Sequence, residues 1–405
     1  MKKLSLIPIL IIITISLFYS CKETKQEKEQ TVTVIKSVDF KTNIVDLHYR
    51  FKGLYYDKYL KQDIVYFSDF AKNFIKTFNL QGEIMDSIPL ENVIKEVRRR
   101  IIFIAPYSRD TIFCGEKENN KIIVINHDGN IYHTININDF IHDSLKDLYF
   151  FDRRGINFQS KTSNKLLLHT SPTYEELLQK YNKTDLDIIA ANAFFYKIYY
   201  NSPYFFEMNN IFSDKIEYRF GVNDFYKKYF TEDDATMAHD TYFKEINDFI
   251  FILSDSKNKI LKINPDNFEI LKVINIKSKY SNTGYSYSVE TPFKDEKLYK
   301  QETSYSGRIA ELFYNEKTKQ YYVILNHSVK NKEEYEFYSH FDYRPFSVIV
   351  YDKNLENPEE YKFEGNIYNC RNSFMSQEGL WIQRKPENLT KENYGTQTFD
   401  LLEFN

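Results

Sequence analysis

Glycine is scarce in this chain, with 11 residues in 405. Loops that bind phosphate groups need several glycines close together, because the backbone must turn sharply and approach the phosphate. Neither GxxxxGK[ST] nor GxGxxG occurs, and residues 284–288 (GYSYS) lack the second glycine of a hydrolase nucleophile turn. The sequence therefore argues against a nucleotide enzyme, and no cofactor is expected.

Cysteine is also rare: the chain contains only Cys21, Cys114 and Cys370. Two cysteines without further ligands do not make a metal site. Cys114 and Cys370 would pair in an exported protein if the fold brought an early strand beside a late one. The sequence alone is therefore compatible both with a disulfide between these two cysteines and with two free thiols.

A strong excess of one charge is missing, since the formal net charge is −3. Proteins that bind nucleic acid through its phosphates usually carry a pronounced basic surface. The arginine runs at 98–100 and 153–154 are short and stand among acidic residues, which is typical of a solvated face. No nucleic-acid partner is expected.

Only one long apolar run is present, at residues 4–18, and it follows Lys2 and Lys3. This layout is typical of a secretory signal, and the run is short for a membrane span, which needs about 20 apolar residues. Residues 21–30 are charged and offer nothing to a core. We expect a cleaved signal over residues 1–20 and a flexible tether over 21–38.

Residues 17–21 (LFYSC) resemble a bacterial lipobox, in which a small residue precedes a cysteine that receives diacylglycerol before cleavage. The resemblance implies that Cys21 is lipidated and that the membrane is a partner through this lipid. Several acyl chains on one cysteine hold a protein firmly, at about 0.8 kcal/mol per buried CH₂. The alternatives are an uncleaved N-terminal anchor and plain secretion with Cys21 unmodified.

Aromatic residues are abundant, with 34 Tyr and 34 Phe, and they favour β-strands. From about residue 40 the chain repeats short apolar runs separated by polar turns. Residues 249–253, 259–263 and 268–273 form the best unit, and Asp128-Gly129 separates two strand-like runs as a hairpin turn does. The sequence predicts antiparallel strands.

Such units recur every roughly 45 to 65 residues, which is typical of the blades of a β-propeller. We predict an all-β propeller of about six blades over residues 39–405. Residues 173–200 are the exception: Thr173 and Glu176 have capping-box spacing, and apolar residues then recur with helical period. They predict a helical insertion, with a domain boundary as the alternative.

With its signal and its strand–turn–strand repeats, the chain resembles uncharacterised Bacteroidota lipoproteins that are predicted to form a TolB-like six-bladed propeller. The resemblance covers most of the chain beyond the signal and rests on architecture rather than on a sharp motif. It implies a cell-envelope location, with outer membrane anchoring expected and its periplasmic or surface side open. It assigns no activity and no catalytic residues.

Three tyrosine–arginine pairs are the most suggestive site residues, and each stands beside another aromatic residue or a proline. On innermost strands of a propeller they would line a cationic, aromatic pocket for a carboxylate or a sugar. The alternative is that the arginines stack on neighbouring rings for packing. The candidate ligand-binding residues are Arg50, Tyr218, Arg219, Tyr343 and Arg344.

An acidic cluster is the best candidate for a metal site, because carboxylate oxygens bind hard cations. Its residues are Glu232, Asp233, Asp234, His239 and Asp240. The spacing is not that of an EF-hand loop, and a solvated loop is the alternative.

The sequence favours a non-enzymatic envelope module that binds a small ligand, a glycan or a protein on one propeller face. The alternative is a propeller enzyme, a glycosidase or lyase acting on an extracellular polymer, whose acids converge from different blades. A deep pocket with two facing carboxylates would favour the enzyme. A shallow aromatic channel mouth would favour binding.

Overall fold

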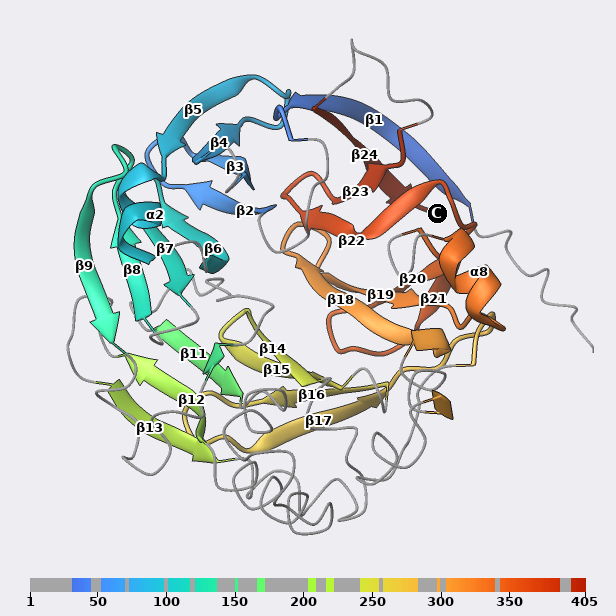
Figure 1. Ribbon diagram of the computed structural model, residues 1–405. Helices are drawn as coiled ribbons and strands as arrows, with labels where there is room; N and C mark the ends of the chain where they lie inside the picture. Colours follow the sequence, from blue (N-terminus) through green and yellow to red (C-terminus); the bar gives the residue numbers. More distant parts are fainter. Residues whose placement is uncertain are drawn as a thin grey trace, which may run out of the picture.

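Four-stranded antiparallel sheets stand around a common centre in the computed structural model, like the blades of a propeller (Figure 1). The description covers residues 31–44, 52–69, 73–97, 101–116, 121–136, 150–151, 166–171, 203–208, 216–221, 241–254, 258–282, 297–298, 304–338, 343–386 and 395–405. The all-β propeller predicted from the sequence is confirmed.

Five of the sheets are meanders in which successive strands pair, and the remaining sheet adds the first described strand to three successive strands from the other end of the chain. In the regular blades, the strand that begins the successive run lies nearest the centre of the ring (Figure 1). The first regular blade contains β2 (Lys52–Asp57), β3 (Gln62–Asp69), β4 (Phe74–Phe78) and β5 (Ile84–Pro89). The second contains β6 (Ile101–Ser108), β7 (Thr111–Glu116), β8 (Lys121–Ile125) and β9 (Ile131–Asn136).

Three further regular blades complete the set. One contains β14 (Thr241–Ile246), β15 (Phe249–Ser254), β16 (Lys259–Ile263) and β17 (Ile270–Asn275). The next contains β18 (Arg308–Asn315), β19 (Gln320–Asn326), β20 (Phe346–Tyr351) and β21 (Glu359–Phe363). The last contains β22 (Tyr368–Met375), β23 (Leu380–Arg384), β24 (Thr396–Phe404) and, from the other end of the chain, β1 (Val32–Lys41).

The prediction of about six blades is approximately right: five of the described sheets are regular blades. A sixth sheet contains β10 (Phe150–Phe151), β11 (Leu166–Ser171), β12 (Pro203–Met208) and β13 (Ile216–Gly221), and its first strand has two residues. The helical insertion predicted at 173–200 lies outside the described residues. The described helices are α2 (Glu91–Val97) and α8 (Lys332–Phe337), and no helix in the described ranges is both long and apolar enough to cross a membrane.

The turns show how a glycine-poor chain builds so many hairpins. Gly129 has φ +75° in the turn between β8 and β9, which confirms the hairpin predicted at Asp128-Gly129. Elsewhere asparagine commonly takes the left-handed conformation: Asn247 and Asp248, with φ 50° and 60°, make the two-residue turn between β14 and β15. Asn and Asp tolerate this region better than other non-glycine residues.

Pairing between β1 and β24 closes the ring. Val32 lies opposite Phe404 and Lys41 lies opposite Thr396, so the first described strand becomes the outer strand of the last blade. The tether predicted over residues 21–38 is therefore too long at its C-terminal end, because residues 32–38 are already in β1. Val34 and Ile35 are exposed beside a bulge, which weakens the apolar alternation by which a strand is recognised in sequence.

Aromatic packing joins the closing blade to the first blade. Phe40 of β1 is fully buried, and its ring centroid lies 5.4 Å from that of Phe67, 5.5 Å from Phe78 and 5.7 Å from Phe399. Trp381 belongs to the same buried cluster. Edge-to-face and tilted rings at these distances are favourable beyond the area they bury. This cluster anchors the β1 segment to two blades at once.

Candidate functional site

A pocket opens where the innermost strands of all five regular blades end. Its lining comes from the ends of β2, β6, β14, β18 and β22 and from the turns that follow them. The cavity holds about 150 Å³. The lining residues are Leu54, Tyr55, Tyr56, Lys58, Asp63, Tyr107, Ile246, Asn247, Tyr314, Glu316, Met375, Ser376 and Gln377.

Four tyrosines give the pocket its aromatic character. Tyr56 and Tyr107 are half-buried, on β2 and β6. Tyr314 is held by the ring of Tyr321, 4.6 Å away between centroids. Tyr55 is nearly fully buried, and burial raises the pKa of its hydroxyl well above the usual value. The Tyr55 hydroxyl is therefore neutral, and the four tyrosines together supply flat apolar faces.

Polar groups at the rim supply hydrogen bonds. Lys58 and Glu316 are exposed, whereas Asp63 is buried and its carboxylate accepts a 2.8 Å hydrogen bond from the backbone N–H of Gln377. That bond ties one of the two acids to the turn between β22 and β23. An apolar surface with a few convergent polar groups is the usual composition of a small-molecule site.

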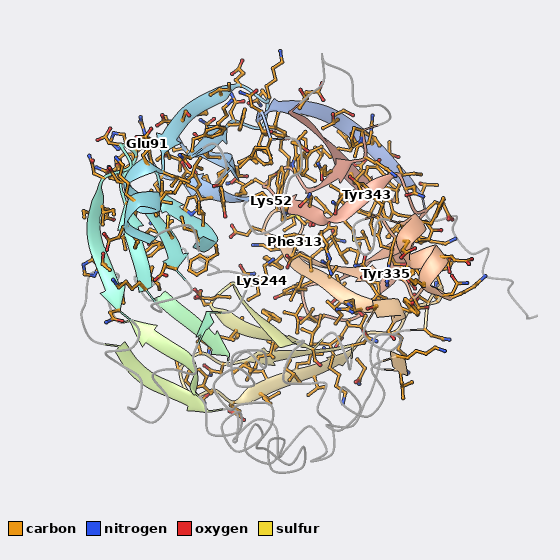
Figure 2. The ribbon with its side chains drawn as sticks, viewed as in Figure 1. Lys52, Glu91, Lys244, Phe313, Tyr335 and Tyr343 are labelled. Carbon is orange, nitrogen blue, oxygen red and sulfur yellow. The ribbon has the colours of Figure 1, made fainter. Side chains whose placement is uncertain are left out.

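Charged side chains lie deeper, toward the centre of the ring. Lys52 of β2, Lys244 of β14 and Phe313 of β18 come from three blades and approach one another in Figure 2. The Lys244 ammonium forms a 2.7 Å ion pair with Glu311 and lies 4.1 Å from the centroid of the Phe313 ring. Only 4% of its side chain is exposed, so this pair is fixed by its surroundings.

Lys52 faces a less favourable environment than Lys244. Its Nζ donates a 2.5 Å hydrogen bond to the backbone carbonyl of Ser373 on β22. Burial, reinforced by the charge of Lys244, lowers the pKa of Lys52 to about 7, although Glu311 and Cys370 act in the opposite direction. At neutral pH this lysine is therefore close to half protonated.

The sequence candidates Tyr343 and Arg344 lie just before β20 and have structural contacts. Arg344 is fully buried, donates to the carbonyls of Ser304 and Ser306, and stacks 4.8 Å from the centroid of Tyr335. Burial, with the charges of Arg308 and Arg371, lowers the pKa of Arg344 to about 9. The packing interpretation thus describes Arg344 better than the ligand interpretation.

The three tyrosine–arginine pairs do not share one position in the ring. Tyr218 and Arg219 lie on β13, the last strand of its sheet and not the innermost one (Figure 1). This corrects the expectation that the arginines recur along the channel, because the pairs occupy different strand positions. Arg50 lies outside the described residues.

The two interior cysteines do not form a disulfide. Cys114 on β7 and Cys370 on β22 are buried and lie on different blades. The Cys370 Sγ instead donates to the Asn326 side-chain oxygen at 2.6 Å. An early strand does lie beside a late strand, as expected of a closed ring, but the two strands are β1 and β24. Cys114 lies on neither of them.

Two further candidate sites fall outside the described residues, namely Cys21 and the acidic cluster Glu232, Asp233, Asp234, His239 and Asp240. Within the part of the chain that is described, no group of three or more His, Cys, Asp or Glu side chains is arranged to hold a metal ion.

No family model and no curated protein matches this chain. A solved structure of a DUF4221 family member from Bacteroides vulgatus is similar in fold, with a TM-score of 0.69 and 16% sequence identity. The match covers 93% of this chain and 98% of the other. At this identity the likeness shows the fold alone, and it agrees with the propeller part of the resemblance noted from the sequence.

Two more distant propellers match at lower scores. A luciferin-regenerating enzyme has a TM-score of 0.42 at 9% identity, covering 92% of this chain and 95% of its own. Regucalcin, a calcium-binding protein from Agrobacterium tumefaciens, has a TM-score of 0.40 at 9% identity, covering 89% and 92%. These scores are too low for any argument about function.

Proposed function

We propose that this chain is a cell-envelope lipoprotein whose propeller binds a small ligand, of the sugar-ring class, in the tyrosine-lined pocket. The observation that carries the proposal is the convergence of five innermost strands on one small cavity with four tyrosines in its lining. Sugar rings present C–H faces that pack on aromatic rings and hydroxyls that bond to carboxylates and amides.

Binding is favoured over catalysis by the state of the two pocket acids. A glycosidase needs two carboxylates that face each other across the substrate, one of them free to exchange a proton. Here Asp63 is engaged by a backbone N–H, and Glu316 is exposed on the turn after β18. An aromatic channel mouth of this kind supports a binding module.

Two tyrosine substitutions test the pocket. Tyr56→Ala and Tyr107→Ala each remove a half-buried ring from the lining. Each is expected to weaken binding of a sugar ligand about tenfold or more, corresponding to about 1.4 kcal/mol. The measurement is calorimetric titration against a panel of monosaccharides and disaccharides, preceded by a thermal-shift screen, since a ligand of the native state must raise the melting midpoint.

Tyr132→Ala is the matched control, because Tyr132 is a partly exposed tyrosine on β9 that does not belong to the pocket lining. The Tyr132→Ala variant should bind the sugar ligand with the same affinity as the unmodified protein. If all three variants bind alike, the pocket is not the binding site.

Membrane anchoring is tested separately, at Cys21. Cys21→Ala should abolish incorporation of a labelled fatty acid into the protein, because the thiol that would receive the lipid is absent. Cys114→Ala, a change at a buried thiol of the ring, should leave this labelling unchanged. An N-terminal peptide with an unmodified Cys21 and Lys2 still attached, seen by mass spectrometry, would exclude lipidation and favour an N-terminal anchor.

A further inference from the structure

An uneven set of charges lies on the innermost strands next to the pocket, two residues before its lining on β2 and β14. Lys52, Lys244 and Glu311 come from three innermost strands; Lys244 forms an ion pair with the Glu311 carboxylate, and Lys52 is influenced by the charges of both. Glu311 Oε1 already accepts from Lys244 Nζ at 2.7 Å and from the N–H of Leu312 at 3.0 Å. With both lysines protonated, this three-residue cluster carries one net positive charge.

Lys52 is the member with unused hydrogen-bonding capacity. A lysine ammonium has three donors. In the described residues the hydrogen-bond acceptor of Lys52 Nζ is the Ser373 carbonyl, an uncharged group. Lys52 as a residue is half-buried, and the Glu311 side chain is 31% exposed. Burial of a charge without an ionic partner is costly.

The cluster is within reach of a ligand in the pocket. Lys52 precedes Leu54 by two residues on β2, and Lys244 precedes Ile246 by two residues on β14. Residues two apart on a strand point to the same face and lie about 7 Å apart along it. Leu54 and Ile246 both line the pocket. An atom group at one end of a sugar-sized ligand can therefore approach the lysines while its ring contacts the tyrosines.

We propose that the ligand of this pocket carries a carboxylate, and that Lys52 and Lys244 bind it. The inference rests on the proposed function, because the pocket holds the rest of the ligand. A monoanion matches the single net positive charge of the cluster better than a phosphate dianion does. Ammonium–carboxylate bonds in a partly dehydrated site are charge-assisted and strong.

Binding of the carboxylate is coupled to the proton on Lys52. The charged groups that face Lys52 are Lys244 and Glu311, with the Cys370 thiol also near, and its pKa in the free protein is about 7. Only the ammonium form attracts the anion. Affinity is therefore expected to be full below pH 7 and to fall by up to tenfold per pH unit above it.

Glucuronate and glucose provide matched probes, because they differ in one carboxylate on the same ring. For the full purified chain at pH 6, glucuronate is expected to bind at least tenfold more tightly than glucose, and the ratio should shrink at pH 8.5. Lys52→Met should abolish the preference while leaving glucose binding intact. This variant keeps the Lys244–Glu311 ion pair, so the ring should still fold.

Lys262→Met is the control. Lys262 also lies over an aromatic ring, with its Nζ 3.7 Å from the centroid of Phe249, but it belongs to β16, which is not an innermost strand. It should bind both sugars as the unmodified protein does. NMR titration of the Lys52 Nζ supplies a second readout: saturation with glucuronate, or with acetate as the bare anion, should raise the pKa of Lys52 by about one unit or more.

The outcomes separate the two proposals. Equal binding of glucose and glucuronate, unaffected by Lys52→Met, overturns the carboxylate site and leaves the pocket function standing. If neither sugar binds but acetate raises the pKa of Lys52, the sugar-binding function fails and the anion site stands. Sulfate binding in place of acetate would retain an anion site and overturn the carboxylate assignment. No change in the pKa of Lys52 with any of these anions overturns the anion site.

Discussion

His327 shows how strongly the interior of the ring disfavours a charge. The imidazole is 5% exposed, and its Nε2 shares a 2.8 Å hydrogen bond with the Ser347 hydroxyl. Burial lowers the pKa of His327 to about 4, against the opposing effect of Glu360. The folded protein therefore keeps this residue neutral at a pH where the unfolded chain protonates it.

A pH dependence of stability follows from His327. Between about pH 6.5 and pH 4 the unfolded state binds a proton that the native state does not, so stability falls as the pH falls. The loss from this residue between pH 7 and pH 5 is about 2 kcal/mol. Urea unfolding at pH 7 and at pH 5 measures this loss of stability. The loss should be about 2 kcal/mol smaller for His327→Gln than for the unmodified protein. Identical losses in both proteins would contradict the assignment.

Sequence patterns do not show which cations are buried, and this explains which site residues were recognised from the sequence. A cation next to a tyrosine was noted at Arg344, and the residue is indeed buried against the Tyr335 ring, but in a structural role. Lys52 and Lys244 were missed. Lysine is the commonest surface cation, and nothing in the sequence around either residue distinguishes a channel lysine from a solvated one.

At the scale of elements, one polar network holds the closing blade together. Asp400 of β24 is fully buried and accepts hydrogen bonds from Tyr368 of β22, Arg384 of β23 and Ser37 of β1. Its carboxylate also forms a 2.6 Å ion pair with Arg384 Nη2. A single side chain thus contacts the other three strands of its sheet.

Replacing that carboxylate should loosen the blade. Asp400→Asn leaves the Arg384 guanidinium without its anionic partner. The variant is expected to lose about 2–3 kcal/mol of unfolding free energy. This is less than for a fully buried pair, because the Arg384 side chain is 40% exposed. Asp39→Asn is the control: Asp39 is an exposed acid of β1 bonded to Thr398, and its loss should cost less than about 0.5 kcal/mol. Chemical unfolding of both variants measures the difference, and equal stabilities would contradict the role of Asp400.

The elements recognised from the sequence were mostly the middle strands of the blades. The runs predicted at 259–263 and 249–253 match β16 and most of β15, because strands buried on both faces are continuous apolar runs. The innermost strands β2, β6, β14 and β22 were not predicted. Lys52 and Lys244, which point toward the channel, interrupt the apolar pattern in two of them, so the strands that form the site carry the weakest strand signal.

At the scale of the whole molecule, the propeller class and the approximate number of blades followed from the repeat of hairpins, whereas the irregularity of one sheet did not. Turn signals mark where strands reverse but not which sheet a strand joins. The pocket could not be predicted for a related reason: its lining comes from five blades spread over residues 54–377, and their proximity exists only once the ring is closed.

The pairing of the first and last strands also determines when the pocket comes into being. Thr31 and Asn405 exchange two backbone hydrogen bonds at one end of this pairing, so β1 has no partner strand until β24 is in place. Closing so long a loop is a late and slow event, because its entropy is lost before the contacts form. Until the two strands pair, β1 and the last blade each keep an open strand edge, and removal of β24 would leave β1 without a partner strand.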